Sequence, residues 1–487
     1  MYRHKEFVES IEEQYARAHG AKLKSKTFSW PWLLRNVVLP AGDQLFGQRM
    51  IDRLRMLEEA QWWNRERLHE ERDRLLRELV SVAHREVPFY RQLMDQAGVR
   101  PEDIRTPADL CKLPVVTKQM LRTGYPALTT RSTGQKTYES RTSGSTGQNF
   151  AVMEDAATKG WYLASFLLSL EWAGWEIGHP HVQTGMTLRR DLGRRLKDHL
   201  LGCHYVSAFD LDDAHIDEAL DFIDAHNIEH VWGYAASLYY FALRAQERGW
   251  NRPLHSVVTW GDNLYPHYRR AIENTFRTRV TDTYGIGEGI QVSAQCGSAD
   301  NYHVHTLDVI VEYLDDEGRP VAEGEAGNLI LTRLHAGPMP LIRYRVGDLG
   351  IAGDQSPCAC GRGLDRMRSI QGRDTDVVLT PSGNRLIVEF FNGIIDDIPE
   401  IESFQVVQEH LDTLAVIVVP RPGFSEDTKR TLIEAIHRNG AADVKIAVEC
   451  VNEIPLTPGG KRRYVINKIA RPPMSLAEPP GGRQPFS

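Results

Sequence analysis

Cysteine is scarce in this sequence, and long apolar runs are missing. Six cysteines are spread over 487 residues, too few for a scaffold held together by disulfides. The most apolar stretch near the N-terminus, residues 30–40, contains Arg35 and is too short to cross a bilayer. Residues 1–20 alternate charged and apolar side chains and lack the apolar centre of a signal peptide. We therefore predict a cytoplasmic protein without membrane insertion.

An excess of positive charge is also missing. The formal net charge is −7, so no broad cationic field would neutralise the phosphates of a long nucleic acid. We predict no nucleic-acid partner and expect small molecules instead. The composition is otherwise that of a globular protein, with 41% hydrophobic and 25% charged residues, and the length fits two domains better than one.

The N-terminal part is predicted to be an extension followed by a helix. Residues 1–50 contain the loop-forming combinations Trp-Pro-Trp and Leu-Pro-Ala-Gly, and we interpret them as an irregular N-terminal extension. From Ile51 to about Leu93, apolar residues recur at three- and four-residue spacing among many Glu and Arg residues. This spacing predicts a packing helix.

The rest of the chain is predicted to form two domains of different kinds. Over residues 51–374, helical stretches such as 161–172 alternate with short β-rich runs such as 255–260, which indicates a large layered α/β domain. Over residues 375–470, short β-rich runs accompany one helix, which is typical of a small α+β domain. Residues 471–487 are rich in Pro and Gly and are predicted to be disordered.

Hydroxyl groups and glycines are concentrated in one short segment, Thr142, Ser143, Gly144, Ser145, Thr146 and Gly147. Because β-prone residues stand on both sides, we expect a hairpin-like loop. Its exposed backbone N–H groups and hydroxyls would suit a polyphosphate. No Gly-Lys-Ser/Thr follows, so it is not a Walker A loop. An ordinary surface turn would have the same composition.

Three later segments supply the other groups that a nucleotide site needs. They are Tyr284-Gly285-Ile286-Gly287-Glu288, Arg343-Tyr344-Arg345-Val346-Gly347-Asp348 and Gly460-Lys461. Together with segments at 87–90, 113–118, 233–238 and 372–376, and in this order, they resemble the adenylate-forming ligases. Within these they are similar to the phenylacetate–CoA ligase family and its capsular-polysaccharide-associated relatives. The similarity runs from about Leu54 to Lys468.

The resemblance implies an adenylate-forming ligase fold of α/β class, with a large layered N-terminal domain and a small mobile α+β C-terminal domain. It also implies a reaction in two steps. A carboxylate attacks the α-phosphate of ATP to give acyl-AMP and pyrophosphate, and a second nucleophile then takes the acyl group. ATP, Mg²⁺ and CoA are the cofactors and co-substrates that this reaction would use.

The resemblance assigns a role to each matching residue. Glu288 would be a catalytic residue and an oxygen ligand for Mg²⁺. Tyr284 offers a flat face to adenine, and the two oxygens of Asp348 suit the ribose hydroxyls. The other ATP-binding positions are the loop 142–147, Gly261, Asp262, Asn263, Gly285 and Arg373.

Lys461 is the second expected catalytic residue. It follows Pro458-Gly459-Gly460, and a cation at the α-phosphate would lower the barrier to adenylation. The alternative is that Lys461 belongs to a solvated Lys-Arg-Arg run. Thr375 and Asp376 match the hinge about which the C-terminal domain of this family rotates.

Three positions depart from the family pattern. Gln148 and Asn149 follow the phosphate loop where many relatives have Lys-Pro, so one phosphate-binding cation is missing. Asp262 stands where Glu is usual beside adenine, and Thr375 stands where Asp or Lys is frequent at the hinge. The last change makes the ease of domain rotation an open question.

The resemblance places the substrate acid near residues 234–238 and the Tyr284 segment. The expected pocket residues are Tyr138, Trp232, Tyr234, Ala235 and Ser237. An aromatic lining suits an aromatic acid. Aromatic side chains at such positions also occur as packing residues of a protein core, and this alternative stays open.

Four further residues form a pattern of metal ligands, namely Cys296, His303, Cys358 and Cys360. Thiolates and an imidazole are the ligands that tetrahedral zinc prefers, and four protein ligands would make the site structural. His305 could replace His303, because the two side chains would point to opposite faces of a strand. The alternative is four unrelated side chains.

Three functions are therefore compared. The first is an acid–thiol ligase that makes an acyl-CoA from an aromatic acid. The second is an amide-forming ligase that passes its acyl-adenylate to an amine acceptor. The third is a non-catalytic nucleotide-binding scaffold. The presence of Glu288, Asp348 and Lys461 argues against it, because a scaffold would not need these residues. A homodimer is compatible with all three.

Overall fold

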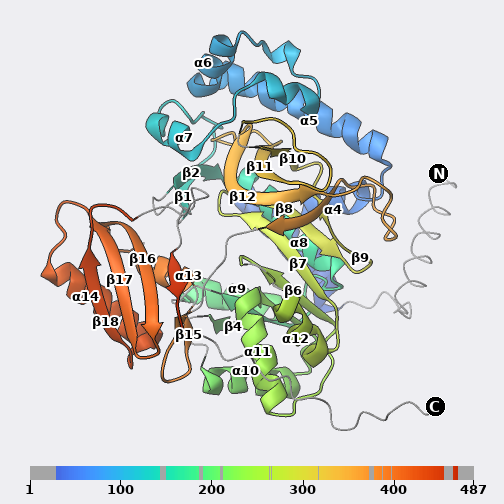
Figure 1. Ribbon diagram of the computed structural model, residues 1–487. Coiled ribbons are helices and arrows are strands. Elements are labelled where there is room, and N and C mark those ends of the chain that lie inside the picture. The colour runs from blue at the N-terminus through green and yellow to red at the C-terminus, as the bar shows by residue number, and fades with distance from the viewer. Residues whose placement is uncertain are drawn as a thin grey trace, which may run out of the picture.

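The computed structural model in Figure 1 describes most of the chain and confirms the predicted α/β class. The described residues are 29–142, 150–185, 190–208, 212–262, 264, 266–315, 317–371, 378–386, 388–395, 397–454 and 464–469. No helix in these ranges is long and apolar enough to span a membrane.

The N-terminal part is helical, so the prediction of an irregular extension was wrong for residues 30–46. These residues form α2 (Trp30–Leu33), the π-helix η1 (Leu34–Val38) and α3 (Leu39–Phe46). The prolines that were interpreted as loop signals lie in the first turns of α2 and α3. Pro31 loses no helical hydrogen bond, because the first N–H groups of a helix have no partner anyway. Pro40 follows η1 closely, and the helical run continues through it to Phe46.

The predicted packing helix is three helices. They are α4 (Met50–Ala60), α5 (Arg65–Glu86) and α6 (Pro88–Ala97). The Asn64 side chain accepts a hydrogen bond from the Arg67 N–H at 2.9 Å and so begins a new helix. Pro88 opens α6. Two short 3₁₀ helices, Pro101–Asp103 and Pro107–Lys112, and α7 (Lys118–Gly124) follow.

An eleven-stranded sheet forms the centre of the molecule (Figure 1). One half is parallel and consists of β3 (His181–Gly185), β4 (Cys203–Ser207), β5 (His230–Tyr234), β6 (Ser256–Trp260) and β7 (Val280–Ile286). The other half is antiparallel and consists of β8 (Ile290–Cys296), β9 (Ala299–Val304), β10 (Val309–Leu314), β11 (Ala326–Arg333), β12 (Tyr344–Ala352) and β13 (Arg366–Gln371). Strand β7 is the junction of the two halves.

Helices cover both faces of the parallel half. Val257 packs with α10 (Asp213–Ala225), α11 (Ala235–Glu247) and α12 (Pro266–Phe276). Its neighbour Val258 packs with α4 and α8 (Ala156–Trp172). Successive strand residues point to opposite faces, so the sheet lies between two helical layers. A further helix, α9 (Leu192–Leu201), lies between β3 and β4 in the chain.

The hairpin expected around the phosphate loop is confirmed. Strand β1 (Thr137–Thr142) pairs antiparallel with β2 (Phe150–Asp155), and Thr142 lies opposite Phe150. The loop itself, residues 143–149, lies outside the described residues.

The C-terminal region has a core of its own. A four-stranded sheet consists of β18 (Lys445–Cys450), β17 (Thr413–Pro420), β16 (Ile401–His410) and β19 (Val465–Asn467). It packs with α13 (Val388–Ile395), α14 (Glu426–Ile436) and the π-helix η4 (His437–Ala441), and a small β14–β15 hairpin (Val378–Leu379, Arg385–Leu386) precedes it. The α+β architecture agrees with the prediction, while the boundaries at 375 and 471 and the predicted disordered tail 471–487 lie outside the described residues.

Candidate functional site

The predicted nucleotide residues gather where the parallel strands end. Tyr234 closes β5, Gly261 follows β6, and Tyr284 lies near the end of β7. In open α/β sheets, ligands bind at this edge. Gly261 has φ of 82°, and a Cβ at this position would lie 2.5 Å from Cε1 of Tyr234. Only glycine therefore lets the chain pass this ring.

Asp262 fixes the start of α11. Its carboxylate accepts hydrogen bonds from the N–H groups of Ala235 at 2.6 Å and Ala236 at 3.0 Å. Loss of hydration raises the pKa of Asp262 to about 7, although the two N–H donors favour the charged form. This residue thus orients the helix that carries the predicted pocket residues Ala235 and Ser237.

Two of the predicted ATP-binding residues are in direct contact. The hydroxyl of Tyr284 donates a hydrogen bond to Oδ2 of Asp348 on β12 at 2.8 Å. Gly285, the next residue of β7, is also described, and a Cβ there would lie 2.9 Å from Oε1 of Gln291. The side chains predicted to contact adenine and ribose therefore meet, although β7 and β12 are not adjacent strands.

Glu288 is the buried acid of the site. It lies in the turn after β7, and the residue is only 2% exposed. Its Oε1 accepts a hydrogen bond from the Tyr344 hydroxyl at 2.6 Å and lies 3.2 Å from Nζ of Lys118. A buried carboxylate needs such partners, since leaving it unpaired would cost several kcal/mol.

Sequence reasoning missed Lys118 as a site residue. It is the first residue of α7, and the Thr117 side chain caps this helix by accepting from the Met120 N–H at 3.3 Å. The signal was available, because Lys118 ends one of the family segments at 113–118. What the sequence lacked was the contact with Glu288, which lies far away along the chain.

Several predicted residues lie outside the described part of the chain. They are Ser143, Gly144, Ser145, Thr146, Gly147, Asn263, Arg373, Thr375, Asp376 and Lys461, together with the side chain of Thr142. Their roles stay predictions.

The predicted pocket residues divide into two groups. Trp232 is 4% exposed and packs against His181 and Trp175, with ring centroids 3.9 and 4.8 Å apart. These contacts are those of a core side chain, as the alternative interpretation had it. Ala235 and Ser237 are fully buried in the first turn of α11. Tyr138 on β1 and Tyr234 remain accessible.

Three aromatic side chains missed by the sequence analysis continue from Tyr234. Trp260 lies 6.5 Å from the Tyr234 ring, and Phe166 of α8 lies 5.6 Å from Trp260. Tyr162 stacks on Phe166 at 6.3 Å. The four-residue spacing of Tyr162 and Phe166 was the available signal, because it places both on one face of a helix.

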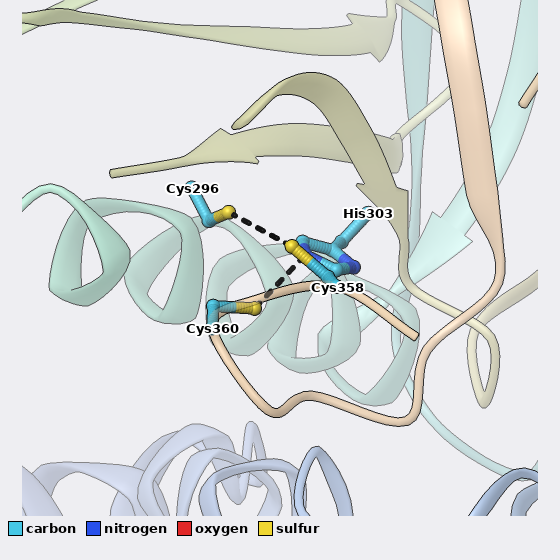
Figure 2. A group of neighbouring side chains, drawn as sticks. All are labelled: Cys296, His303, Cys358 and Cys360. Carbon is cyan, nitrogen blue, oxygen red and sulfur yellow. Dashed lines mark hydrogen bonds between the residues drawn. The ribbon is translucent and has the colours of Figure 1, made fainter. Parts of the chain in front are cut away.

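The four predicted metal ligands converge, as Figure 2 shows. Their ligand atoms all lie within 4.8 Å of one another; Cys296 Sγ is 3.8 Å from Cys358 Sγ, and Cys360 Sγ is 3.2 Å from Nε2 of His303. Two sulfurs at about 2.3 Å from a tetrahedral zinc would be roughly 3.8 Å apart. Hydrogen bonds with Cys296 and His303 lower the pKa of the Cys360 thiol.

The structure selects His303 over His305. His303 lies on β9 beside the end of β8, where Cys296 is located, and the loop between β12 and β13 brings the other two cysteines. His305 is turned elsewhere: its Nε2 lies 2.9 Å from Oγ of Ser169, and its ring stacks on Trp172.

Comparisons with known proteins agree with this architecture. Residues 378–468 match the model of the CapK C-terminal domain. Phenylacetate-coenzyme A ligase of Thermus thermophilus is 27% identical over 443 residues, which is 83% of this chain and 97% of that protein. Protein CapK of Staphylococcus aureus is 22% identical, covering 82% of this chain and 90% of its own length.

A solved structure shows the same fold. The 2-hydroxyisobutyryl-CoA ligase in its thioesterification state, with 2-HIB-AMP and CoA, superimposes with a TM-score of 0.57 at 19% identity, covering 84% of this chain and 91% of that one. The strand-end site, the separate C-terminal domain and these relatives agree: the chain has the fold of the adenylate-forming enzymes and is similar to the phenylacetate–CoA ligases and to CapK.

Proposed function

We propose that this protein activates a carboxylic acid with ATP as acyl-AMP and transfers the acyl group to CoA. The observation that carries the proposal is the buried contact of Glu288 with Lys118 and Tyr344 beside the Tyr284–Asp348 pair. A nucleotide between these groups would have its base and ribose at the pair and its phosphates toward Glu288. The ligase relatives support the same reaction.

In this proposal, Lys118 supplies the positive charge that a lysine after the phosphate loop supplies in many relatives. Gln148 stands where many relatives have lysine, and Lys118 places an ammonium group beside Glu288 instead. Its side chain is 14% exposed, so its charge is screened less than that of a surface lysine. The ammonium would compensate the negative charge that ATP adds to this acidic region.

Glu288 fits a ligand of Mg²⁺. The two contacts that the described residues make with its carboxylate both reach Oε1, and a hard cation would bind at Oε2. When bound, Mg²⁺ would neutralise phosphate charge. The protein's own contribution is to hold the Glu288 carboxylate in one orientation.

Lys461 and the hinge at Thr375 and Asp376 complete the proposed cycle. Lys461 would contact the α-phosphate during adenylation and then withdraw, so that CoA can reach the acyl carbon. An amine acceptor is the second candidate, because the same withdrawal would open the acyl carbon to any nucleophile. We place the reaction in the cytoplasm, where ATP and CoA are available.

We also propose a structural zinc at Cys296, His303, Cys358 and Cys360. The sulfur spacing of 3.8 Å and the buried position of three of the four residues support it. A site with four protein ligands has no free position for a substrate, so this zinc would stabilise the fold.

The test is a screen of carboxylic acids for pyrophosphate release from ATP, followed by a screen of acceptors. We expect acid-dependent pyrophosphate release and, with CoA present, a thioester detected by mass spectrometry. Amide formation with release of AMP, and no thioester, would select the amine acceptor. Binding of ATP without pyrophosphate release for every acid would support the scaffold and contradict the proposal.

A further inference from the structure

Glu154, the penultimate residue of β2, has a buried carboxylate without a full set of partners. The residue is 3% exposed, and the Ser140 side chain hydrogen-bonds to its carboxylate. No described residue forms a hydrogen bond with its Oε1. Among the described residues, no cation reaches ion-pair distance of it. A buried acceptor without a partner destabilises the folded protein, and more so when it is charged. A ligand group that donates a hydrogen bond would complete it.

The carboxylate of Glu154 adjoins the proposed reaction site. Its Oε1 packs on the backbone of Gly289, where an added Cβ would lie only 2.1 Å away. Gly289 follows Glu288 directly. Glu154 also lies opposite Tyr138 in the β1–β2 hairpin, so both side chains share one face.

Lys159 lies one turn into α8 and belongs to the same environment. Its Nζ is 4.5 Å from the centroid of the Tyr162 ring. Burial lowers the pKa of Lys159 and raises that of Glu154, while each charge opposes the shift of the other. Burial, and then the Glu154 charge, raise the pKa of Tyr162. The two polar groups thus lie at one end of the aromatic row Tyr162, Phe166 and Trp260.

A structural explanation for Glu154 is incomplete. The nearest candidate counter-charge is Arg333, but its Nη1 and Nη2 donate to the carbonyl oxygens of Glu288 and Met339 at 3.4 and 2.8 Å. Arg333 also has Asp308 and Asp155 as further acidic neighbours. Glu154 is the first of the charges that act on this guanidinium, yet among the described residues its Oε1 receives no hydrogen bond from Arg333 or any other donor.

We propose that Glu154 and Lys159 recognise a hydroxyl group on the substrate acid, at a position remote from its carboxylate. A hydroxyl donates to Oε1 of Glu154 and accepts from Nζ of Lys159. An ammonium group would satisfy Glu154 but would be repelled by Lys159, and a plain aryl or alkyl group would satisfy neither. This inference rests on the proposed function and makes the substrate class a hydroxylated carboxylic acid.

The test uses acyl sulfamoyl adenosines, which mimic acyl-AMP and do not react. Matched pairs carry benzoyl and 3- or 4-hydroxybenzoyl groups, and pentanoyl and 5-hydroxypentanoyl groups, with 4-(aminomethyl)benzoyl as the ammonium probe. In calorimetry with the full-length protein, the hydroxylated member of at least one pair should bind at least tenfold more tightly. Sites built to hydrogen-bond a hydroxyl discriminate strongly against analogues that lack it.

The variant Glu154→Leu should abolish or invert this preference, and Glu154→Gln should keep part of it. Glu139→Leu is the matched control, because Glu139 is exposed on the neighbouring strand, and it should change nothing. Thermal unfolding of each variant checks that it is folded.

The outcomes are distinct. Equal binding within every pair, or a preference unchanged by Glu154→Leu, overturns the hydroxyl assignment and leaves acid adenylation standing. If the aminomethyl probe binds most tightly, the group that Glu154 recognises is an ammonium group and not a hydroxyl, and the assignment is also overturned. If no analogue binds and no acid releases pyrophosphate, the proposed function fails and this inference fails with it.

Discussion

At the scale of single residues, the site depends on how buried charges are paired. Glu288 would be unstable in its buried position without the Tyr344 hydroxyl and the Lys118 ammonium. The same ammonium faces the region where ATP phosphates would lie. Removing it should therefore affect nucleotide binding and adenylation together.

We predict that Lys118→Ala lowers the rate of acid-dependent pyrophosphate release about 10- to 100-fold and raises the KM for ATP, because one charge contact is lost. Lys118→Arg should retain more activity. The control is Lys136→Ala, an exposed residue just before β1. Wild-type kinetics in Lys118→Ala would show that this lysine only balances Glu288.

Lys461→Ala is predicted to fold normally and to lose adenylation by roughly two to three orders of magnitude, the scale of deleting a transition-state charge contact. The control is Lys468→Ala, because Lys468 forms an ion pair with Glu409 at 2.6 Å on the C-terminal sheet. Pyrophosphate release measures both variants. An unchanged rate in Lys461→Ala would remove this residue from the mechanism.

At the scale of elements, the cysteine and histidine cluster consists of residues from three parts of the antiparallel half. Cys296 ends β8, His303 lies on β9, and Cys358 and Cys360 come from the loop before β13. Strands β9 and β13 share only two paired positions. A metal at this point would compensate for the short pairing.

We predict about one zinc per chain in protein purified without added metal. Cys358→Ser/Cys360→Ser should lose it and unfold at a lower temperature, while turnover below that temperature stays the same, because a closed site supplies no chemistry. Metal analysis and thermal unfolding measure the two effects. Cys450→Ser, an exposed cysteine outside the cluster, should match the wild type, and a metal-free wild type of equal stability would contradict the prediction.

At the scale of the whole molecule, stability should depend on pH through buried histidines. Burial lowers the pKa of His181 to about 4 and that of His230 to about 3, against about 6.5 in an unfolded chain. Below pH 6.5 the unfolded state binds protons that the folded state does not, so stability is full above this pH and falls as the pH drops toward 4.

We predict that lowering the pH from 7 to 5 costs at most about 2 kcal/mol per buried histidine. His230→Gln should reduce the loss, and His410→Gln, at an exposed position of β16, should not. Urea unfolding at the two pH values gives the comparison. An equal pH dependence in wild type and His230→Gln would assign the acid sensitivity to other groups.

The second prediction for the whole molecule concerns rotation of the C-terminal domain. Thr375→Pro fixes φ and removes an amide donor at the predicted hinge. We expect acyl transfer to the acceptor to fall more than adenylate formation, because only transfer requires the second arrangement. Single-turnover measurements separate the two steps, and equal loss of both, or of neither, would place the hinge elsewhere.

The sequence by itself indicated the family resemblance, the fold class and the hairpin around the predicted phosphate loop. These follow from local patterns: motif order, apolar periodicity, and turn residues between β-prone stretches. It also predicted the cysteine and histidine cluster that the structure brings together, apart from the choice between His303 and His305. Local signals were misleading where a residue type occurs in two kinds of structure, as with Pro31 and Pro40, which lie in helices and not in loops.

Only the tertiary structure decided which distant side chains meet. The contact of Lys118 with Glu288 and the burial of Glu154 against Gly289 join segments that are far apart in the chain. Trp232 and Tyr234 lie two residues apart, yet one packs in the core and the other borders the site. These outcomes depend on the order of strands in the sheet and on the helices packed against it, and no local periodicity encodes that order.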